Sequence, residues 1–344
     1  MGTFGRSFGL QWHLTDQCDQ RCKHCYIWSK KEKVKLSKKK LNLEQCVSVV
    51  DKFFQFCESF KVDPIFGITG GDPFLFPAIW ELLKYLHRKG APFIILGNPF
   101  YITPDICEKL VNFGCRGYQM SLDGLEQTHD TIRKKGSFKD TFRALKILQS
   151  FKIRTTIMST VSRLNFQEIP ELIKIVVDYG VDAFDFARYC PVTKEDGIRL
   201  NLTPQEYRKF LSDIWKVYTR LANYRTKFGL KDHLWTLFLY EERLFRINDL
   251  DIVLQGCNCA IRHLAVLPDG TVYACRRFKS PVGNILTQSF QEIFLGKKLS
   301  QYREIKKLEG CRDCELLNYC RGCHAVSYGT FGNFFAKDPQ CWKC

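Results

Sequence analysis

Residues 18–26 have the sequence CDQRCKHCY, in which Cys18, Cys22 and Cys25 are spaced C-x3-C-x2-C. They follow a short apolar run at 8–14 that predicts a β-strand. Three closely spaced thiolates can bind three irons of a 4Fe–4S cluster and leave the fourth iron open for another ligand. A structural zinc site generally takes four protein ligands, and His24 is too close to Cys25 to serve easily as the fourth. The spacing therefore favours an iron–sulfur cluster over zinc.

The chain alternates predicted strands and helices from this motif to about residue 190. The strands are predicted at 8–14, 64–69, 93–96, 116–122, 153–161 and 183–189, and the helices between them at 43–60, 78–89, 104–113, 137–151 and 168–179. Repeated βα units of this kind predict an α/β fold with a parallel sheet and right-handed crossovers. Six units can close partly into an incomplete barrel or lie open in a doubly wound sheet, and periodicity does not decide between them. Residues 202–228 predict a further helix, and 229–255 a helical bridge.

The composition of the chain predicts its cellular compartment and the kind of partner that it binds. The chain has 344 residues, 17 cysteines and a formal net charge of +16. An odd cysteine count excludes complete internal pairing, and the close spacings favour metal or cluster binding over disulfides. There is no export signal and no apolar stretch long enough to cross a bilayer, so we predict a cytoplasmic protein without membrane contact. The lysine-rich run at 30–40 suits either a solvated loop or attraction of an acidic partner. No zinc-finger, RRM or KH signature supports nucleic acid as that partner.

A second group of cysteines follows Gly256. The turn Pro268-Asp269-Gly270 can bring Cys259 and Cys275 together. Further along, a C-x2-C-x5-C-x2-C run on its own is also compatible with zinc. The cysteines of this region are Cys257, Cys259, Cys275, Cys311, Cys314, Cys320, Cys323, Cys341 and Cys344.

With its cysteine triplet on the loop after the first strand, the sequence resembles the radical S-adenosylmethionine (SAM) superfamily. The resemblance implies a partial (β/α)6 TIM-like barrel in which SAM chelates the open iron through its amino and carboxylate groups. One electron from the cluster then cleaves SAM, and the 5′-deoxyadenosyl radical abstracts a hydrogen atom from an unactivated C–H bond. A low-potential donor such as flavodoxin or ferredoxin is the implied electron source.

Other segments resemble the SAM-binding motifs of the same family. Gly70-Gly71-Asp72-Pro73 resembles the family's GGEP motif, which holds the SAM amino group, although Asp replaces the commoner Glu. Ser121-Leu122-Asp123-Gly124 with Arg133 resembles a segment in which Ser and Arg contact the SAM carboxylate, a task that suits the guanidinium fork. Arg188, near the end of the sixth predicted strand, is a further candidate for a cofactor contact, with a buried ion pair as the alternative.

The C-terminal pattern resembles a SPASM domain, which typically holds two auxiliary 4Fe–4S clusters. The resemblance implies one cluster on Cys257, Cys259, Cys275 and Cys323, and another on Cys311, Cys314, Cys320 and Cys341. The last gap of the four-cysteine run, which ends at Cys323, is x2 where x3 is usual, and Cys344 is an alternative ligand to Cys341. The predicted organisation is a radical SAM barrel at 1–200, a helical bridge at 201–255 and a small cysteine-rich iron–sulfur SPASM domain at 256–344.

SPASM-bearing enzymes mostly modify peptides or proteins, so we expect a maturase of a ribosomally made peptide, with thioether or other cross-link formation as the leading chemistry. A sulfatase-type formylglycine-generating maturase and a peptide epimerase are alternatives, and a non-enzymatic iron–sulfur electron carrier is a third class. Cys190 is a hypothetical hydrogen-atom donor, and Cys190→Ala would exclude that role if the product stayed unchanged. Asp123 and Asp251 are candidate general bases. Only 17 residues precede Cys18, so we expect leader recognition to lie elsewhere, on 229–255, the basic run or a separate protein.

The remaining cysteines, Cys46, Cys57, Cys107 and Cys115, lie on apolar helical faces or beside strands and are predicted to be small core residues.

Overall fold

The computed structural model describes residues 7–27, 40–247 and 252–343. Most of the lysine-rich run, Asp251 and Cys344 therefore lie outside the described residues. The described chain forms two compact units that interleave along the sequence. Unit 1 comprises Met1–Met120, Arg143–Thr155 and Cys259–Arg303, and unit 2 comprises Ser121–Phe142, Thr156–Asn258 and Glu304–Cys344. These units divide the chain differently from the three sequence segments predicted above, which stay a prediction.

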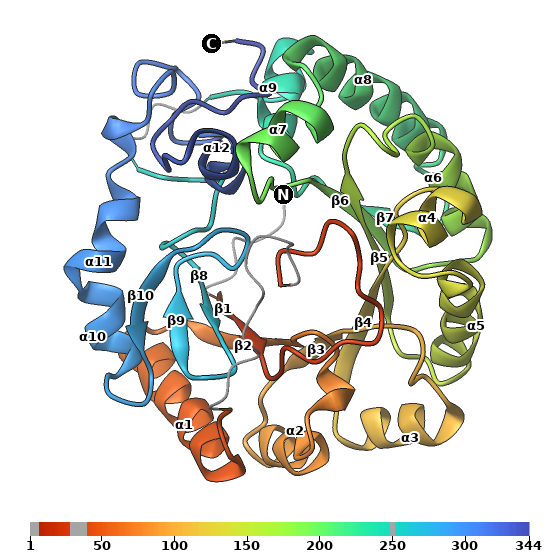
Figure 1. The fold of residues 1–344 in the computed structure, drawn as a ribbon, viewed down its shortest axis with the longest axis vertical. Coiled ribbons are helices and arrows are strands. Elements are labelled where there is room, and N and C mark those ends of the chain that lie inside the picture. Colours follow the sequence, from red (N-terminus) through yellow and green to blue (C-terminus); the bar gives the residue numbers. More distant parts are fainter. Residues whose placement is uncertain (1–6, 28–39, 248–251, 344) are drawn as a thin grey trace. The chain divides into compact units, whose positions relative to one another are not determined.

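Unit 1 is built on a seven-stranded stretch of sheet in the order β10-β9-β8-β1-β2-β3-β4 (Figure 1). Strands β8, β1, β2, β3 and β4 are parallel, and β9 runs antiparallel to both β8 and β10. The strand bounds are β1 Ser7–His13, β2 Asp63–Thr69, β3 Phe93–Leu96, β4 Cys115–Ser121, β8 His263–Val266, β9 Thr271–Tyr273 and β10 Pro281–Asn284. The predicted strands and their parallel arrangement are thus confirmed to within one or two residues in this unit.

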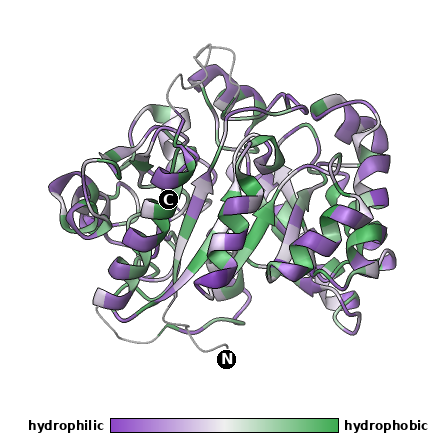
Figure 2. Cartoon of the chain, turned by 90° about the horizontal axis from the view of Figure 1, so that it is seen from below, coloured by the Kyte–Doolittle hydropathy of each residue, from purple (hydrophilic) through white to green (hydrophobic). Residues whose placement is uncertain are grey.

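Amphipathic helices follow these strands because apolar residues recur at helical spacing. Helix α1 (Leu43–Ser59) begins with a capping box between Asn42 and Gln45, and it buries six apolar or cysteine side chains. Its Phe53 packs edge-on against Phe66 of β2 and Phe290 of α10. The other helices of this region are α2 Ile79–Arg88, α3 Pro104–Asn112, α5 Ser137–Ser150, α10 Phe290–Leu295 and α11 Lys297–Ser300, with a 3-10 turn η1 at Pro73–Leu75. Figure 2 shows apolar residues concentrated on the strands and polar residues on outer helix surfaces.

The two faces of the unit 1 sheet differ in character. Phe8, Leu10 and Trp12 alternate onto the helix-covered face of β1 and are at most 4% exposed. The opposite face carries small, polar or partly exposed residues in matching register, where Gly9 pairs with Ile65 and Gln11 with Gly67. Ile65 is 40% exposed on this face. A sheet face that is neither helix-covered nor fully buried is available to a ligand, and we call it the open face.

Unit 2 contains β5 (Thr155–Val161), β6 (Ala183–Arg188) and β7 (Lys227–Phe228), paired in parallel in that order. Its helices are α4 Glu126–Ile132, α6 Ile169–Asp178, α7 Lys194–Leu200, α8 Pro204–Arg220, α9 Leu234–Glu241 and α12 His324–Phe331, with a 3-10 turn η3 at Ile305–Lys307. A further 3-10 turn, η2 Gln301–Arg303, ends the last segment of unit 1. The predicted single helix at 202–228 is wrong at its C-terminal end. Thr226 donates its hydroxyl to the Val181 carbonyl (2.7 Å) and Lys227 pairs with Ala183, so sheet pairing overrides helical propensity there.

The predicted helical bridge at 229–255 is helical only over α9 among its described residues. No helix in the described ranges is both long and apolar enough to span a membrane.

Candidate functional site

The loop that carries Cys18, Cys22 and Cys25 is seated on the Gly70-Gly71 turn. The Gly71 amide donates to the Thr15 carbonyl and the Asp72 amide donates to the Gln17 carbonyl, each at 2.7 Å. A Cβ on Gly70 would come within 2.5 Å of the Thr15 oxygen, and one on Gly71 would penetrate the Gln17 carbonyl. Gly70 also has a φ of +156°. Both glycines are therefore required for the close approach of these two backbones, a role that the motif alone did not reveal.

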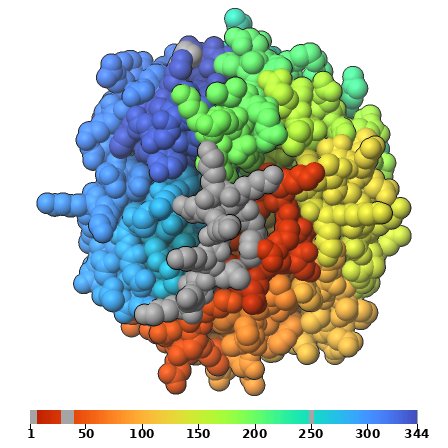
Figure 3. All heavy atoms as spheres, viewed as in Figure 1, coloured from red at the N-terminus to blue at the C-terminus, as the bar shows by residue number. Residues whose placement is uncertain are grey.

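A hydrogen-bonded arrangement connects this turn to the first cysteine. Asp72 is fully buried, and its carboxylate accepts from the amides of Phe74 (2.9 Å) and Asn98 (2.7 Å). The Asn98 side chain in turn donates to Asp19 Oδ1 (2.8 Å) and to Cys18 Sγ (3.4 Å). A thiolate that accepts such bonds is stabilised as a ligand. The Asp72 side chain thus positions the loop, while the segment of residues 14–27 is partly uncovered on the face shown in Figure 3.

Asp72 makes a testable contribution to pH dependence. Burial raises its pKa from 3.8 to about 7, and the amide bonds from Asn98 and Phe74 offset this only in part. Because the folded chain then holds this proton more tightly than the unfolded chain, the stability of the wild type should decline between pH 3.8 and about 7. We expect Asp72→Asn to remove that component. Urea midpoints of both proteins across this range test it, and parallel pH profiles would contradict it.

The second predicted SAM-binding segment, in unit 2, is organised around Asp123. Ser121 ends β4 and is partly exposed. Asp123 is fully buried, and its carboxylate accepts from Arg133 Nε at 2.5 Å and from the Thr160 amide at 2.7 Å. His129 accepts from the Asp123 amide (3.1 Å). These contacts favour a positioning role for Asp123, which orients the Arg133 guanidinium, over the role of general base that the sequence suggested.

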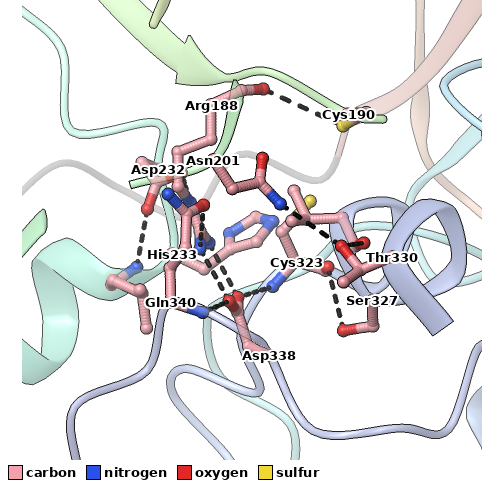
Figure 4. Close-up of polar contacts among 12 residues, drawn as sticks. Arg188, Cys190, Asn201, Asp232, His233, Cys323, Ser327, Thr330, Asp338 and Gln340 are labelled. Carbon is pink, nitrogen blue, oxygen red and sulfur yellow. Dashed lines mark hydrogen bonds and ion pairs between the residues drawn. The ribbon is translucent and has the colours of Figure 1, made fainter. Parts of the chain in front are cut away.

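Arg188 lies in a buried ionic network, shown in Figure 4. Its guanidinium pairs with Asp338 through two bonds of 2.7 and 2.8 Å and with Asp232 through Nε at 2.8 Å. It also donates to Gln340 and lies over the Tyr207 ring, 5.0 Å from the centroid. Arg188 is 2% exposed. The structure thus favours the buried ion pair, which was the alternative, over a cofactor contact for Arg188.

The same network reaches Cys323. Asp338 Oδ2 accepts from the Cys323 amide at 2.7 Å, directly before α12 begins (Figure 4). His233 forms a side-chain hydrogen bond with Cys257 and lies close to Cys323, and these contacts outweigh burial and raise the pKa of His233. In unit 2, therefore, Cys257 and Cys323 both lie close to His233, as two ligands of the predicted first auxiliary cluster would. Sequence patterns did not identify His233, Asp232 or Asp338. Of the three, only Asp338 has a sequence feature that could have pointed to it, since it lies three residues before Cys341.

Four other cysteines line one pocket that is partly open to solvent. They are Cys311, Cys314, Cys320 and Cys341. Among the described residues, no three His, Cys, Asp or Glu side chains converge closely enough to bind a single metal ion. The four cysteines that line the pocket are the set predicted for the second auxiliary cluster. Cys323 does not line the pocket, which agrees with its predicted assignment to the other cluster despite the shortened x2 gap.

In unit 1, the hairpin of β8 and β9 has the turn that the sequence predicted. Gly270 has a φ of +83°, and Ala265 pairs with Tyr273 across the hairpin. Cys275 follows the end of β9 by two residues, and Cys259 forms an isolated bridge with His263, the first residue of β8. The hairpin therefore returns the segment that leads to Cys275 alongside β8, next to which Cys259 lies.

The other cysteines divide by burial. Cys46, Cys57 and Cys107 are at most 2% exposed, and burial raises their pKa values to about 12, 12 and 11 respectively. Burial also raises the pKa of Cys115 to about 11. These thiols stay protonated and act as core residues. Cys190 is 8% exposed, and its sulfur lies 3.8 Å from the Arg188 carbonyl oxygen. Neither observation tests its role as a hydrogen-atom donor, which stays a hypothesis.

Comparison with known proteins identifies both parts of the chain. The family model described as the radical SAM superfamily matches residues 12–176, and that of the SPASM iron–sulfur cluster-binding domain matches residues 257–324. The chain is 24% identical to an AdoMet-dependent heme synthase of Methanosarcina barkeri, over 96% of this chain and 95% of that protein. It is 29% identical to the mycofactocin maturase MftC of Mycolicibacterium smegmatis, over 87% of this chain and 72% of that protein.

A solved structure of anSMEcpe with AdoMet and the Cp18Cys peptide bound has the same fold. It superposes with a TM-score of 0.73 at 19% identity, over 97% of this chain and 94% of anSMEcpe. The partial barrel with a C-terminal SPASM region is thereby confirmed.

Proposed function

The chain belongs to the radical SAM superfamily and carries a C-terminal SPASM domain, and from that membership we propose that it is a peptide maturase. Its cofactors are a SAM-binding 4Fe–4S cluster, SAM itself and auxiliary iron–sulfur clusters. When bound, these groups supply reductive SAM cleavage and hydrogen-atom abstraction. The proposed product is a thioether or another cross-link in a ribosomally made peptide, and a flavodoxin or ferredoxin is the proposed electron donor.

The chain's own residues would divide the work as follows. Cys18, Cys22 and Cys25 would bind the first cluster on the loop that Gly70 and Gly71 seat. The family resemblance assigns the SAM amino group to the backbone of that turn and the SAM carboxylate to Ser121 and Arg133, and within unit 2 Asp123 orients Arg133.

The observation that carries the proposal is the open face of the unit 1 sheet. An extended substrate needs an uncovered surface beside the cluster loop, and this face offers small, polar and partly exposed apolar residues. Gly67 pairs with Ile94, and both are partly exposed. A peptide side chain can pack on the partly exposed apolar residues of this face, Ile65, Ile94 and Leu96. The peptide bound to anSMEcpe in the same fold supports this choice of substrate.

A second candidate is chemistry on an iron porphyrin. Two observations favour it: full-length similarity to a protein named as a heme synthase, and similarity to an Fe-coproporphyrin III synthase of the same organism. A coproporphyrin carries carboxylates, and the net charge of +16 suits an anionic substrate. Sulfatase-type maturation and peptide epimerisation stay as alternatives within the peptide class.

Anaerobic reconstitution with iron and sulfide tests the proposal. We expect 5′-deoxyadenosine on addition of SAM and dithionite, and a precursor peptide encoded beside the gene should lose two hydrogen atoms by mass spectrometry. Turnover of Fe-coproporphyrin III without any change in the peptide would favour the second candidate. Zinc in place of iron, or no 5′-deoxyadenosine, would contradict both.

A further inference from the structure

Arg276 is a cation without a hydrogen-bonded anion in the part of the chain that the structure describes. It follows Cys275 directly after β9 and makes no hydrogen bond or ion pair there. Its Nε is buried without a hydrogen-bond partner. The guanidinium instead lies against two tyrosine rings, 5.0 Å from the centroid of Tyr26 and 5.8 Å from that of Tyr273. Ring contacts hold a guanidinium in place but leave its N–H groups available to an acceptor.

His13 adds a second unsatisfied group to the same cluster. It is the last residue of β1 and is fully buried, yet neither ring nitrogen has a hydrogen-bond partner among the described residues. Burial lowers the pKa of His13, and the Arg276 charge lowers it further, so the neutral imidazole keeps one N–H donor. Its ring centroid lies 6.3 Å from that of Tyr26. A buried polar side chain without a partner is costly unless a ligand completes it.

Within unit 1, the side chains of His13, Tyr26 and Arg276 lie where a substrate on the open face can reach them. His13 follows Gln11 by two residues, and its register partner Thr69 lies two residues beyond Gly67, so the alternation of the strands places His13 at the end of the open face. Tyr26 is adjacent to Cys25 in the sequence and lies close enough to Cys275 to interact with it electrostatically. These side chains therefore adjoin both Cys25, a predicted ligand of the SAM-binding cluster, and Cys275, a predicted ligand of an auxiliary cluster.

We propose that Arg276 and His13 form a subsite that binds a carboxylate of the substrate on the open face. The donors fit this group: a guanidinium binds a carboxylate through paired N–H bonds, and the imidazole N–H supplies another. The subsite would fix one end of the substrate while the apolar row of Ile65, Ile94 and Leu96 contacts its body. This inference rests on the proposed function only in assuming that the substrate reaches this face.

A carboxylate can come from either candidate substrate, either as an acidic group of the peptide or as a carboxylate of a porphyrin. The rival explanation is that Arg276 only balances the negative charge of the neighbouring clusters. The two explanations differ in one respect: a charge-balancing Arg276 would affect the clusters but would not distinguish an acid from its neutral derivative.

Equilibrium binding to the reconstituted protein without reductant separates these possibilities. One arm uses metal-free coproporphyrin III and its tetramethyl ester. The other uses the precursor peptide encoded beside the gene and a version with amidated carboxyl groups. We expect the acid form in at least one arm to bind the wild type about 10- to 100-fold more tightly than its neutral form. In Arg276→Gln that preference should disappear, and the responding arm identifies the source of the carboxylate.

Two further variants control the measurement. Lys298→Gln removes one exposed positive charge from the same unit and should keep the full preference. His13→Phe keeps an aromatic ring, removes the donor and should lower the preference by a smaller factor, which covers the case in which Arg276→Gln fails to fold. Iron and sulfide content and EPR spectra report the clusters independently. The proposal is overturned if neither acid outbinds its neutral form, or if Arg276→Gln and His13→Phe both keep the wild-type preference. SAM cleavage by the wild type, measured separately, shows whether the proposed function itself has failed.

Discussion

Arg188→Met should lower the free energy of unfolding of the described fold by about 3–5 kcal/mol. The substitution keeps an unbranched apolar stem but removes the guanidinium, which leaves the carboxylates of Asp232 and Asp338 buried without their shared cation. At present the Arg188 charge and hydrogen bonds outweigh burial and lower the pKa of Asp338. Without Arg188, these carboxylates must either take up protons or open the structure to water. Urea denaturation monitored by tryptophan fluorescence measures the change.

A matched control exists in the same unit. Arg163 pairs with Glu206 through two bonds of 2.8 and 2.6 Å, but both side chains are more than a third exposed. Arg163→Met should therefore cost only about 0–1 kcal/mol. Cys323 supplies a second readout, because Asp338 also holds its amide, and we expect Arg188→Met to lower the yield of auxiliary cluster after reconstitution. Equal losses of stability in the two variants would show that burial of the pair does not matter.

Gly71→Ala should prevent normal loading of the SAM-binding cluster. Its new methyl group would overlap the Gln17 carbonyl, which is backbone and cannot rotate away. The loop that carries Cys18 must then move, and a displacement of about 1 Å in a reacting constellation can cost about 100-fold in rate. We expect the chain to lose about one cluster of iron and sulfide and to form 5′-deoxyadenosine about 100-fold more slowly.

Gly90→Ala provides the comparison for this variant. Gly90 has a φ of +64° and nothing within 4 Å of the added carbon, so alanine there introduces left-handed backbone strain, which Gly71→Ala does not, but no clash. It should cost about 1 kcal/mol of stability and leave cluster content unchanged. Full cluster content in Gly71→Ala would contradict the seating role of this glycine.

Local periodicity predicted most of the fold, because each βα unit shows its own apolar spacing. The error at 202–228 arose where a distant strand decided the outcome: β7 exists only because β6 offers it an edge. Local spacing has no access to such a contact.

The candidate site shows the same difference between features set by local sequence and features set by distant contacts. Motif spacing predicted Cys18, Cys22 and Cys25 as one ligand set, and the family resemblance grouped the four cysteines that line the C-terminal pocket. Neither could show that Asp72 is fully buried beneath the cluster loop, or that Arg188 has its acidic partners on distant segments. Such roles depend on what lies across the fold from a residue, and single charged residues such as Asp338 have no distinctive neighbours in the sequence.

The separation of Arg188 from Asp338 has a consequence for synthesis on the ribosome. The two residues are 150 positions apart, so at about 5–20 residues per second some 8–30 s pass between the appearance of the guanidinium and that of its two-point partner. During that interval Asp232, 44 positions after Arg188, is the only one of its two carboxylate partners that has been made. Completion of the Arg188 network in unit 2, together with the hydrogen bond that the Cys323 amide donates to Asp338, therefore comes late in translation.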